Sequence, residues 1–153
     1  MLSILIPVYN YNITRLVGEL FHQSERAGII SEIIVYDDDS DIQFKKQNRA
    51  ITDFPGVKYD ELSQNIGRAG IRNKLASAAK YPNLLFIDCD TEIPDQDYLK
   101  KYIQYLNTHQ VVCGGNAYIR TKPDDDSLCL RWKYGIRREQ KPARLRNLKP
   151  WDS

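Results

Sequence analysis

Two aspartates, Asp88 and Asp90, flank a single residue directly after the apolar run of residues 84–87. If the extended backbone of a strand continues through them, both carboxylates project to the same side. Two carboxylates about 4 Å apart in a half-buried pocket repel each other by roughly 4 kcal/mol at an effective dielectric constant near 20, which favours a cation between them. Because Mg²⁺ and Mn²⁺ prefer oxygen ligands and commonly take one or two protein carboxylates, we predict a Mn²⁺ or Mg²⁺ site here. The alternative is an acidic turn that caps the helix opened by Pro94.

Three further aspartates, Asp37, Asp38 and Asp39, follow the apolar residues 33–36. At the end of a strand, such an acid can accept hydrogen bonds from a nucleobase N–H or from ribose hydroxyls. A solvated loop is the alternative, and the last residues of this acidic loop, up to Asp41, could cap a following helix. The acidic triple therefore predicts either a nucleotide contact or a surface turn.

The segment from Asn65 to Asn73 contains groups that suit a diphosphate. Gly67 allows a tight entry into a helix, and the N-terminus of a helix attracts anions. Arg68 and Arg72 are four residues apart and therefore share a helix face. Their guanidinium groups can bind phosphate oxygens, although at least one of them could serve only as a surface ion-pair partner.

Several familiar sites are absent from the sequence. No GxGxxG follows the first strand, and neither GxxxxGK[ST] nor GxSxG occurs, so a dinucleotide site, a P-loop and a nucleophile elbow are not supported. The three cysteines, Cys89, Cys113 and Cys129, lack CxxC spacing and a companion histidine cluster, which argues against a zinc site or a disulfide framework. We expect them to be buried thiols.

The aspartates and the Asn65–Asn73 segment follow apolar runs, and these runs alternate along the sequence with segments of helical pattern. A buried strand reads as a short apolar run between turn residues, and a helix as apolar residues three and four apart. On this basis the predicted strands are residues 2–8, 32–36, 57–62, 83–88 and 111–113, and the predicted helices are residues 12–27, 43–51, 67–79 and 94–107. The alternation predicts an α/β fold with a mostly parallel open sheet and helices on both faces. Because ligands bind at the carboxyl ends of such strands, the polar residues at these ends should converge on one site.

The chain of 153 residues has the length of one ordinary domain, with 42% hydrophobic and 27% charged residues. No apolar run approaches the roughly 20 residues of a membrane span, and the N-terminus lacks the features of a secretory signal, so we expect a cytoplasmic protein.

The net charge of +2 is unevenly distributed, because residues 1–119 hold 12 basic and 15 acidic side chains, whereas residues 120–153 hold 10 basic and 5 acidic ones. This basic segment has no clear helical or alternating period. We expect it to be solvated or covered by a partner, with phosphate, nucleic-acid or membrane-surface contact as the alternative.

Four stretches of the sequence, in this order, resemble the family-two inverting glycosyltransferases of GT-A fold. The stretches are Ser3–Asn10, Glu32–Ser40, Asn65–Gly67 with Ile71–Asn73, and Phe86–Asp90. The resemblance covers residues 1 to about 119 and is strongest to bacterial enzymes that build polysaccharides. It implies a nucleotide-sugar-binding GT-A domain over residues 1–119. Residues 120–153, and Leu130 to Trp151 in particular, would then be a truncated link to an acceptor half.

The resemblance also implies roles for single residues. Arg72 would reach the diphosphate, Asp88 would approach the ribose or the water shell of the metal, and Asp90 would be the direct ligand of Mn²⁺ or Mg²⁺. Pro7, Tyr9 and Asn10 would line the nucleotide pocket, and Asp37 or a neighbour would bind uracil or ribose. The full predicted binding set is Pro7, Tyr9, Asn10, Asp37, Asp38, Asp39, Asn65, Gly67, Arg68, Arg72, Asn73 and Asp88, with Asp88 and Asp90 as metal ligands.

Two departures from the family pattern matter. Asp39 stands where the family usually has glycine, which leaves open the geometry of that turn and the identity of the aspartate that contacts the base. The general base of the family comes from a later segment, which we expect beyond Ser153. Asp124, Asp125 and Asp126 are a weaker candidate for that role.

The expected function is therefore the donor-binding part of a metal-dependent inverting glycosyltransferase that uses a UDP-sugar. The acceptor would be a glycan or a lipid-linked molecule in polysaccharide or glycoconjugate synthesis. We expect no nucleic-acid partner, and contact with the inner membrane face through the basic segment is an option. One alternative is a phosphatase of the haloacid-dehalogenase type, although Glu92 stands where that motif needs the threonine that is here Thr91. The other is a non-catalytic nucleotide-binding module.

Overall fold

The computed structural model describes residues 1–106, 108–118 and 120–148 of the chain. The chain forms two compact units, residues 1–110 and residues 111–153, and each is described by itself. The composition boundary predicted at residues 119 and 120 lies inside the second unit, and residue 119 itself is outside the described residues. The extent of a donor-binding domain therefore stays a prediction.

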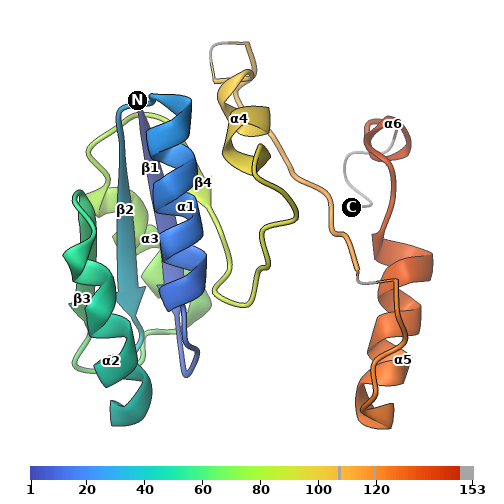
Figure 1. Cartoon of the computed structure of the whole chain (residues 1–153), viewed down its shortest axis with the longest axis horizontal. Coiled ribbons are helices and arrows are strands. Elements are labelled where there is room, and N and C mark those ends of the chain that lie inside the picture. Colours follow the sequence, from blue (N-terminus) through green and yellow to red (C-terminus); the bar gives the residue numbers. More distant parts are fainter. Residues whose placement is uncertain (107, 119, 149–153) are drawn as a thin grey trace. The chain divides into compact units, whose positions relative to one another are not determined.

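The first unit is built on a four-stranded sheet in which every strand runs parallel to its neighbours (Figure 1). The strands are β1 (Leu2–Val8), β2 (Ser31–Asp37), β3 (Val57–Glu61) and β4 (Leu84–Phe86), in the order β3-β2-β1-β4. The two central strands, β1 and β2, are almost continuously apolar and buried, as expected for parallel strands that are covered on both faces. The predicted parallel α/β fold is confirmed.

Helices cover both faces of this sheet, as predicted. They are α1 (Thr14–Ala27), α2 (Ile42–Asn48) with the short 3-10 helix η1 (Arg49–Asp53), α3 (Gly67–Ala78) and α4 (Tyr98–Ile103). On one face, Ile4 packs in a core cluster with residues of α1, η1 and α4, whereas the next residue, Leu5, packs with Ile71 and Leu75 of α3. Successive residues of β1 thus belong to opposite cores, as the alternation of side chains along a strand requires.

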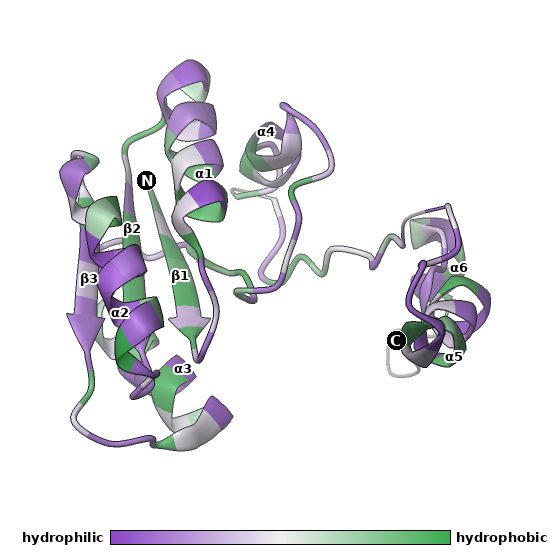
Figure 2. Cartoon of the chain, turned by 60° about the horizontal axis from the view of Figure 1, so that its bottom comes forward, coloured by the Kyte–Doolittle hydropathy of each residue, from purple (hydrophilic) through white to green (hydrophobic). Residues whose placement is uncertain are grey.

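The two edges of the sheet differ in polarity. Figure 2 shows the edge strand β3 largely in the hydrophilic colour, in contrast to the central strand β1, which is largely in the hydrophobic one. At the β3 edge, Lys58, Asp60 and Glu61 face the solvent or form ion pairs. At the β4 edge, Leu84 and Phe86 are 42% and 40% exposed. Within the part of the chain that the structure describes, the β4 edge therefore presents apolar side chains.

A buried carboxylate joins three segments near the amino ends of the strands. Glu32 is only 6% exposed, and its Oε1 accepts hydrogen bonds from Ser3 Oγ at 2.7 Å and from the backbone N–H of Lys80 at 2.6 Å. Its Oε2 accepts from Lys58 Nζ at 3.3 Å. Burial alone raises the pKa of Glu32, but these hydrogen bonds and the Lys58 charge outweigh burial and lower it.

We expect Glu32→Gln to lower the free energy of unfolding at pH 7 by about 1–2 kcal/mol, because a charge-assisted acceptor becomes neutral. Since the pKa of Glu32 is lower in the folded than in the unfolded chain, its contribution is present above the unfolded value of about 4.3. That contribution is lost as the pH falls through the folded value, so the difference between wild type and variant should close in acid. Urea unfolding over this pH range measures it, with the exposed Glu25→Gln as the control. A constant difference would contradict the assignment.

The last helix of the first unit is shorter than predicted. It begins at Tyr98 rather than at Pro94, and the predicted end at Asn107 is outside the described residues. Gln23 of α1, which is 2% exposed, donates from Nε2 to the carbonyl of Asp95 at 2.8 Å and accepts from the N–H of Leu99 at 3.0 Å. This buried amide ties Asp95 to the first turn of α4, and the regular helix begins at Tyr98.

The second unit contains helices where the sequence predicts none. They are α5 (Asp126–Tyr134), the π-helical turn η2 (Gly135–Glu139) and α6 (Ala143–Arg146). This segment forms helices although its sequence has no clear helical period, and the predicted strand at residues 111–113 is wrong, since these residues form no ladder. The predicted link to an acceptor half, Leu130 to Trp151, lies partly outside the described residues. Among the described residues, no helix is both long and apolar enough to cross a membrane.

Candidate functional site

A pocket of about 540 Å³ lies at the carboxyl ends of the strands of the first unit. Small-molecule sites commonly measure about 300–1,000 Å³, so this volume suits a ligand of nucleotide size. Its lining residues come from the ends of β1, β2 and β4 and from α3 and the loop before it. They are Pro7, Val8, Tyr9, Tyr11, Asp38, Asn65, Gly67, Arg68, Ile71, Arg72, Asp88, Cys89 and Asp90.

Most of the residues predicted for the site line this pocket. Those that do are Pro7, Tyr9, Asp38, Asn65, Gly67, Arg68, Arg72, Asp88 and Asp90, and those that do not are Asn10, Asp37, Asp39 and Asn73. Val8, Tyr11, Ile71 and Cys89 also line it, and none of them was predicted as a site residue. All four directly adjoin predicted residues, so the segments that line the pocket were predicted although these positions were not. Ile71 lies three residues after Arg68 on the same helix face.

The two aspartates after β4 lie in a turn rather than in extended backbone. The strand ends at Phe86, and the N–H of Thr91 donates to the carbonyl of Asp88 at 3.1 Å. The prediction of extended geometry is therefore wrong, but both carboxylates still line the pocket. Arg72 of α3 donates from Nη2 to Oδ1 of Asp88 and forms an ion pair with it.

The donor set suits a hard divalent cation. In the described part of the chain, no group of three or more His, Cys, Asp or Glu side chains could enclose a metal ion. Two carboxylates in one pocket fit an ion such as Mg²⁺ or Mn²⁺, which takes the rest of its shell from water and phosphate oxygens. Between them, Cys89 is half-buried, and burial, reinforced by the charges of Asp90 and Asp88, raises the pKa of its thiol. The thiol therefore stays protonated at neutral pH, so the carboxylates are the available donors.

The cysteines differ from the prediction. Cys113 is exposed, and Cys89 and Cys129 are only partly buried. The expectation of three buried thiols is therefore wrong, whereas all three are free, as expected from their spacing.

Asp38 holds the start of α3 instead of standing free in solvent. Its Oδ1 accepts from the N–H of Ile66 at 2.8 Å and its Oδ2 from the N–H of Gly67 at 3.0 Å. Asn65 Nδ2 donates to the carbonyl of Asp38 at 2.9 Å. Gly67 has a φ of +75°, a conformation that glycine adopts without a steric penalty. The acid at the end of β2 thus caps a helix that begins nearly thirty residues later.

We expect Asp38→Ala to lower the free energy of unfolding by about 1 kcal/mol, the usual cost of losing a capping side chain. Asp38→Asn should cost less, because one acceptor oxygen remains. Asp41 is the control: it stands at the N-cap position of α2 but makes no capping hydrogen bond through its side chain, contrary to the prediction. Asp41→Ala should change stability by no more than about 0.5 kcal/mol. Equal losses from the two alanine variants, measured by chemical denaturation, would contradict the capping role.

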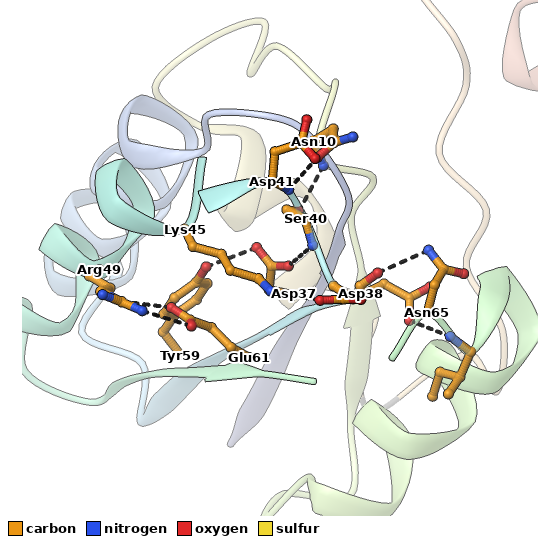
Figure 3. A network of polar contacts seen from close by, with 12 residues as sticks. Asn10, Asp37, Asp38, Ser40, Asp41, Lys45, Arg49, Tyr59, Glu61 and Asn65 are labelled. Atoms are coloured by element: carbon orange, nitrogen blue, oxygen red, sulfur yellow. Dashed lines mark hydrogen bonds and ion pairs between the residues drawn. The ribbon is translucent and has the colours of Figure 1, made fainter. Parts of the chain in front are cut away.

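Asp37 is fully buried, and its carboxylate lies between the turn after β2 and Tyr59 (Figure 3). Its Oδ1 accepts from the N–H of Ser40 at 2.6 Å, and its Oδ2 accepts from the hydroxyl of Tyr59 on β3 at 2.9 Å. Burial, together with the hydrogen bond to Asp37, strongly raises the pKa of Tyr59. The carboxylate therefore fixes the turn after β2 to the neighbouring strand.

The same turn fixes the loop after β1. The N–H of Asn10 donates to Ser40 Oγ at 2.8 Å, and Asn10 Oδ1 accepts from the N–H of Asp41 at 2.7 Å (Figure 3). Asn10 has a φ of +50°, which asparagine tolerates better than most residues. This reciprocal pair holds the loop whose tyrosines, Tyr9 and Tyr11, line the pocket.

Asp39 adopts the left-handed conformation for which the family pattern has glycine. Its φ is +64°, and aspartate is one of the few non-glycine residues that tolerate this region. Its carboxylate accepts from Lys45 Nζ at 2.7 Å, and this contact raises the pKa of Lys45. Asp39 in place of glycine is therefore compatible with the left-handed turn, and it adds an ion pair with Lys45 of α2.

The acidic triple of the second unit has local roles. Asp125 occupies the N-cap of α5 and accepts from the N–H of Ser127 at 2.8 Å. Asp126 accepts from Lys122 at 2.9 Å. Asp125 thus stabilises the start of a helix rather than lying in a free loop, and the proposed base role of this triple gains no support from these contacts.

The chain matches the family model "Glycosyl transferase family 2" over residues 3–151. No curated protein matches it in sequence. Residues 1–349 of S. aureus TarS are 26% identical, with a TM-score of 0.57 over 71% of this chain and 32% of that one. The same part of TarS in complex with UDP-GlcNAc gives a TM-score of 0.58 at 26% identity, over 71% of this chain and 31% of that one.

A third solved structure is similar in fold alone. It is the mannosyltransferase PcManGT from Pyrobaculum calidifontis in complex with GDP-Man and Mn²⁺, at 19% identity and a TM-score of 0.64, over 75% of this chain and 35% of that one. The chain thus spans about a third of the length of the solved structures it matches.

Proposed function

Because this chain belongs to glycosyl transferase family 2, we propose that its first unit binds the nucleotide-sugar donor of a glycosyltransferase. The donor is a UDP-sugar, and the reaction transfers the sugar to an acceptor hydroxyl with inversion at the anomeric carbon. TarS, which has been solved with UDP-GlcNAc and with UDP, supports the choice of a uridine nucleotide. The observation that carries the proposal is the single pocket that holds Arg72, Asp88 and Asp90 together.

Each group of the pocket has a proposed task. The rings of Tyr9 and Tyr11, which are 54% and 44% exposed, offer stacking surfaces for the base. Arg72 binds the diphosphate and stabilises the negative charge that grows on it as the bond to the sugar breaks. Asn10 and Asp37 are assigned a supporting role, since they hold the loops and do not line the pocket.

Asp88 and Asp90 would hold Mn²⁺ or Mg²⁺ against the diphosphate. When bound, such an ion supplies positive charge that offsets the charge of the leaving group. The two carboxylates confine the cation to the pocket that also contains Arg72, so the positive charges converge on one part of the ligand.

The acceptor hydroxyl needs a base from outside this pocket. Among the described residues, the carboxylates that line it are Asp38, Asp88 and Asp90. Asp38 caps α3, and the other two are the proposed cation ligands, so none is free to take a proton from an acceptor. We propose that the acceptor is a glycan or a lipid-linked molecule in polysaccharide or glycoconjugate synthesis, with the basic residues 120–153 as a contact for a membrane surface.

Titration calorimetry with UDP tests the proposal. We expect binding that strengthens when Mn²⁺ is added, whereas metal-independent binding, or none, would contradict it. Release of UDP from UDP-GlcNAc then separates an enzyme from a non-catalytic binding module, which would bind UDP without turnover. The phosphatase alternative predicts turnover of a simple phosphomonoester that is lost in Asp88→Asn, and membership of a different family argues against it.

A further inference from the structure

We infer that Arg72 acts as a latch on the proposed cation site. In the ligand-free pocket its guanidinium neutralises Asp88, and it must leave this carboxylate before a divalent cation can use it. The inference rests on the proposed function. It adds that the cation and the nucleotide diphosphate each assist the binding of the other through one side chain.

The latch is an ion pair between two walls of the pocket. Arg72 projects from α3, Asp88 follows β4, and Nη2 of the arginine donates to Oδ1 of the aspartate. Both residues line the pocket. Their side chains are 35% and 60% exposed, so the pair is partly solvated and can exchange its partners at a low free-energy cost.

Arg72 and Asp88 pair with each other, although each has a neighbour of the same charge in the pocket, Arg68 and Asp90. In the described part of the chain, Asp90 forms no ion pair, and neither does Arg68, one helical turn before Arg72. Of the five charged side chains that line the pocket, Arg72 and Asp88 are thus engaged with each other, and Asp38 accepts hydrogen bonds from the backbone at the start of α3. Arg72 thus occupies Oδ1 of Asp88 and offsets its charge, whereas Asp90 has no ion-pair partner among the described residues.

Linked binding follows from the charges. A guanidinium and a divalent cation repel each other, so they do not share Asp88 at low cost. A diphosphate offers Arg72 other oxygens, with which a guanidinium forms strong paired hydrogen bonds. Arrival of the diphosphate therefore frees Asp88 for the cation, and by reciprocity the cation frees Arg72 for the diphosphate.

The test measures two affinities in the same variant. In Arg72→Gln, the affinity for Mn²⁺ alone, followed by the electron paramagnetic resonance signal of free Mn²⁺, should rise roughly fivefold, since a competing ion pair is removed. The affinity for UDP in saturating Mn²⁺, followed by calorimetry, should fall at least about tenfold, because a charge-assisted contact is lost. The latch thus predicts opposite signs for one substitution.

Arg68→Gln is the matched control, because it removes the same charge from the same helix and pocket without breaking the pair. Its Mn²⁺ affinity should rise by less than about twofold, the part due to charge alone. Arg72→Lys, which keeps the charge but loses the planar fork, should lie between Arg72→Gln and wild type. Circular dichroism and the melting temperature establish that each variant is folded.

Two outcomes would overturn the inference in distinguishable ways. If wild type binds UDP with Mn²⁺ but Arg72→Gln binds Mn²⁺ alone no better than Arg68→Gln does, the latch is wrong and the proposed function stands. If wild type binds neither Mn²⁺ nor UDP, the proposed function is wrong and the latch falls with it.

Discussion

Asp90→Asn is expected to abolish the Mn²⁺-dependent binding of UDP and to leave the fold intact. Asp90 is exposed in the pocket and forms no hydrogen bond or ion pair that holds the described structure together. Asparagine keeps the shape of the side chain but removes the negative charge that a hard divalent cation requires. The loss of affinity should therefore exceed the roughly 10–100-fold that the loss of an outer-shell partner costs a metal site.

Calorimetry with UDP and Mn²⁺ measures this loss, and thermal unfolding measures the stability. Asp53→Asn, an exposed residue of η1 outside the pocket, removes the same charge and should bind like wild type. If Asp90→Asn retained metal-dependent binding, the carboxylate pair would have no part in holding the cation. The pocket would then have to bind the diphosphate through its arginines alone.

Tyr59→Phe should lower the free energy of unfolding by about 2–3 kcal/mol. The hydroxyl of Tyr59 donates to Oδ2 of Asp37, and Asp37 is fully buried. Removing the donor leaves a buried ionised oxygen without this partner, and a hydrogen bond to a charged group contributes more than a neutral one. Denaturant unfolding at pH 7 measures the change.

Tyr81→Phe is the matched control for this prediction, because the structure gives its hydroxyl no hydrogen-bond partner among the described residues. It should change the free energy of unfolding by less than about 0.5 kcal/mol.

The pH dependence of the free energy of unfolding gives a second check on the contact between Tyr59 and Asp37. Since the pKa of Tyr59 is higher in the folded than in the unfolded chain, wild type should lose stability as the pH rises above about 10. Tyr59→Phe should lose less over that range, and parallel curves would refute the contact.

The sheet and the place of the site were predictable because they depend on local patterns. The run Leu2–Val8 is apolar except for Ser3, which identifies a central parallel strand, and Ile33–Tyr36 reads in the same way. Once the strands are parallel, the residues that follow them must meet at one edge. Asp38, Arg72 and Asp90 meet there in the pocket.

The partners of the site residues were not predictable, because they are distant in sequence. Nothing local indicates that Asp38 caps a helix beginning at Gly67, or that Asp37 pairs with Tyr59 rather than with a ligand. Both acids stand in the same motif, yet one lines the pocket and the other is fully buried. Side-chain direction at a strand end depends on the turn that follows, and the left-handed Asp39 sets this turn.

The strand wrongly predicted at residues 111–113 and the unpredicted helix α5 both show that local composition does not determine an element by itself. Residues 111–113 have the composition of a strand, but a strand forms only where another strand accepts its hydrogen bonds, and the sequence does not reveal that partner. The helix α5 has exposed apolar residues, such as Leu130 at 80%, so its pattern lacks the one-sided period by which a helix is recognised.

The different polarity of the two sheet edges has a consequence for self-association. At the β3 edge, charged side chains oppose the approach of another strand, as is usual for protected edges. At the β4 edge, Leu84 and Phe86 lie two residues apart and partly exposed on a strand of only three residues. An apolar edge of this kind is a template for pairing with a further strand, whether from this chain or from a second copy. Any edge-to-edge association of this sheet would therefore use β4, which leads into the Asp88–Asp90 turn, and its length of three residues keeps such pairing short.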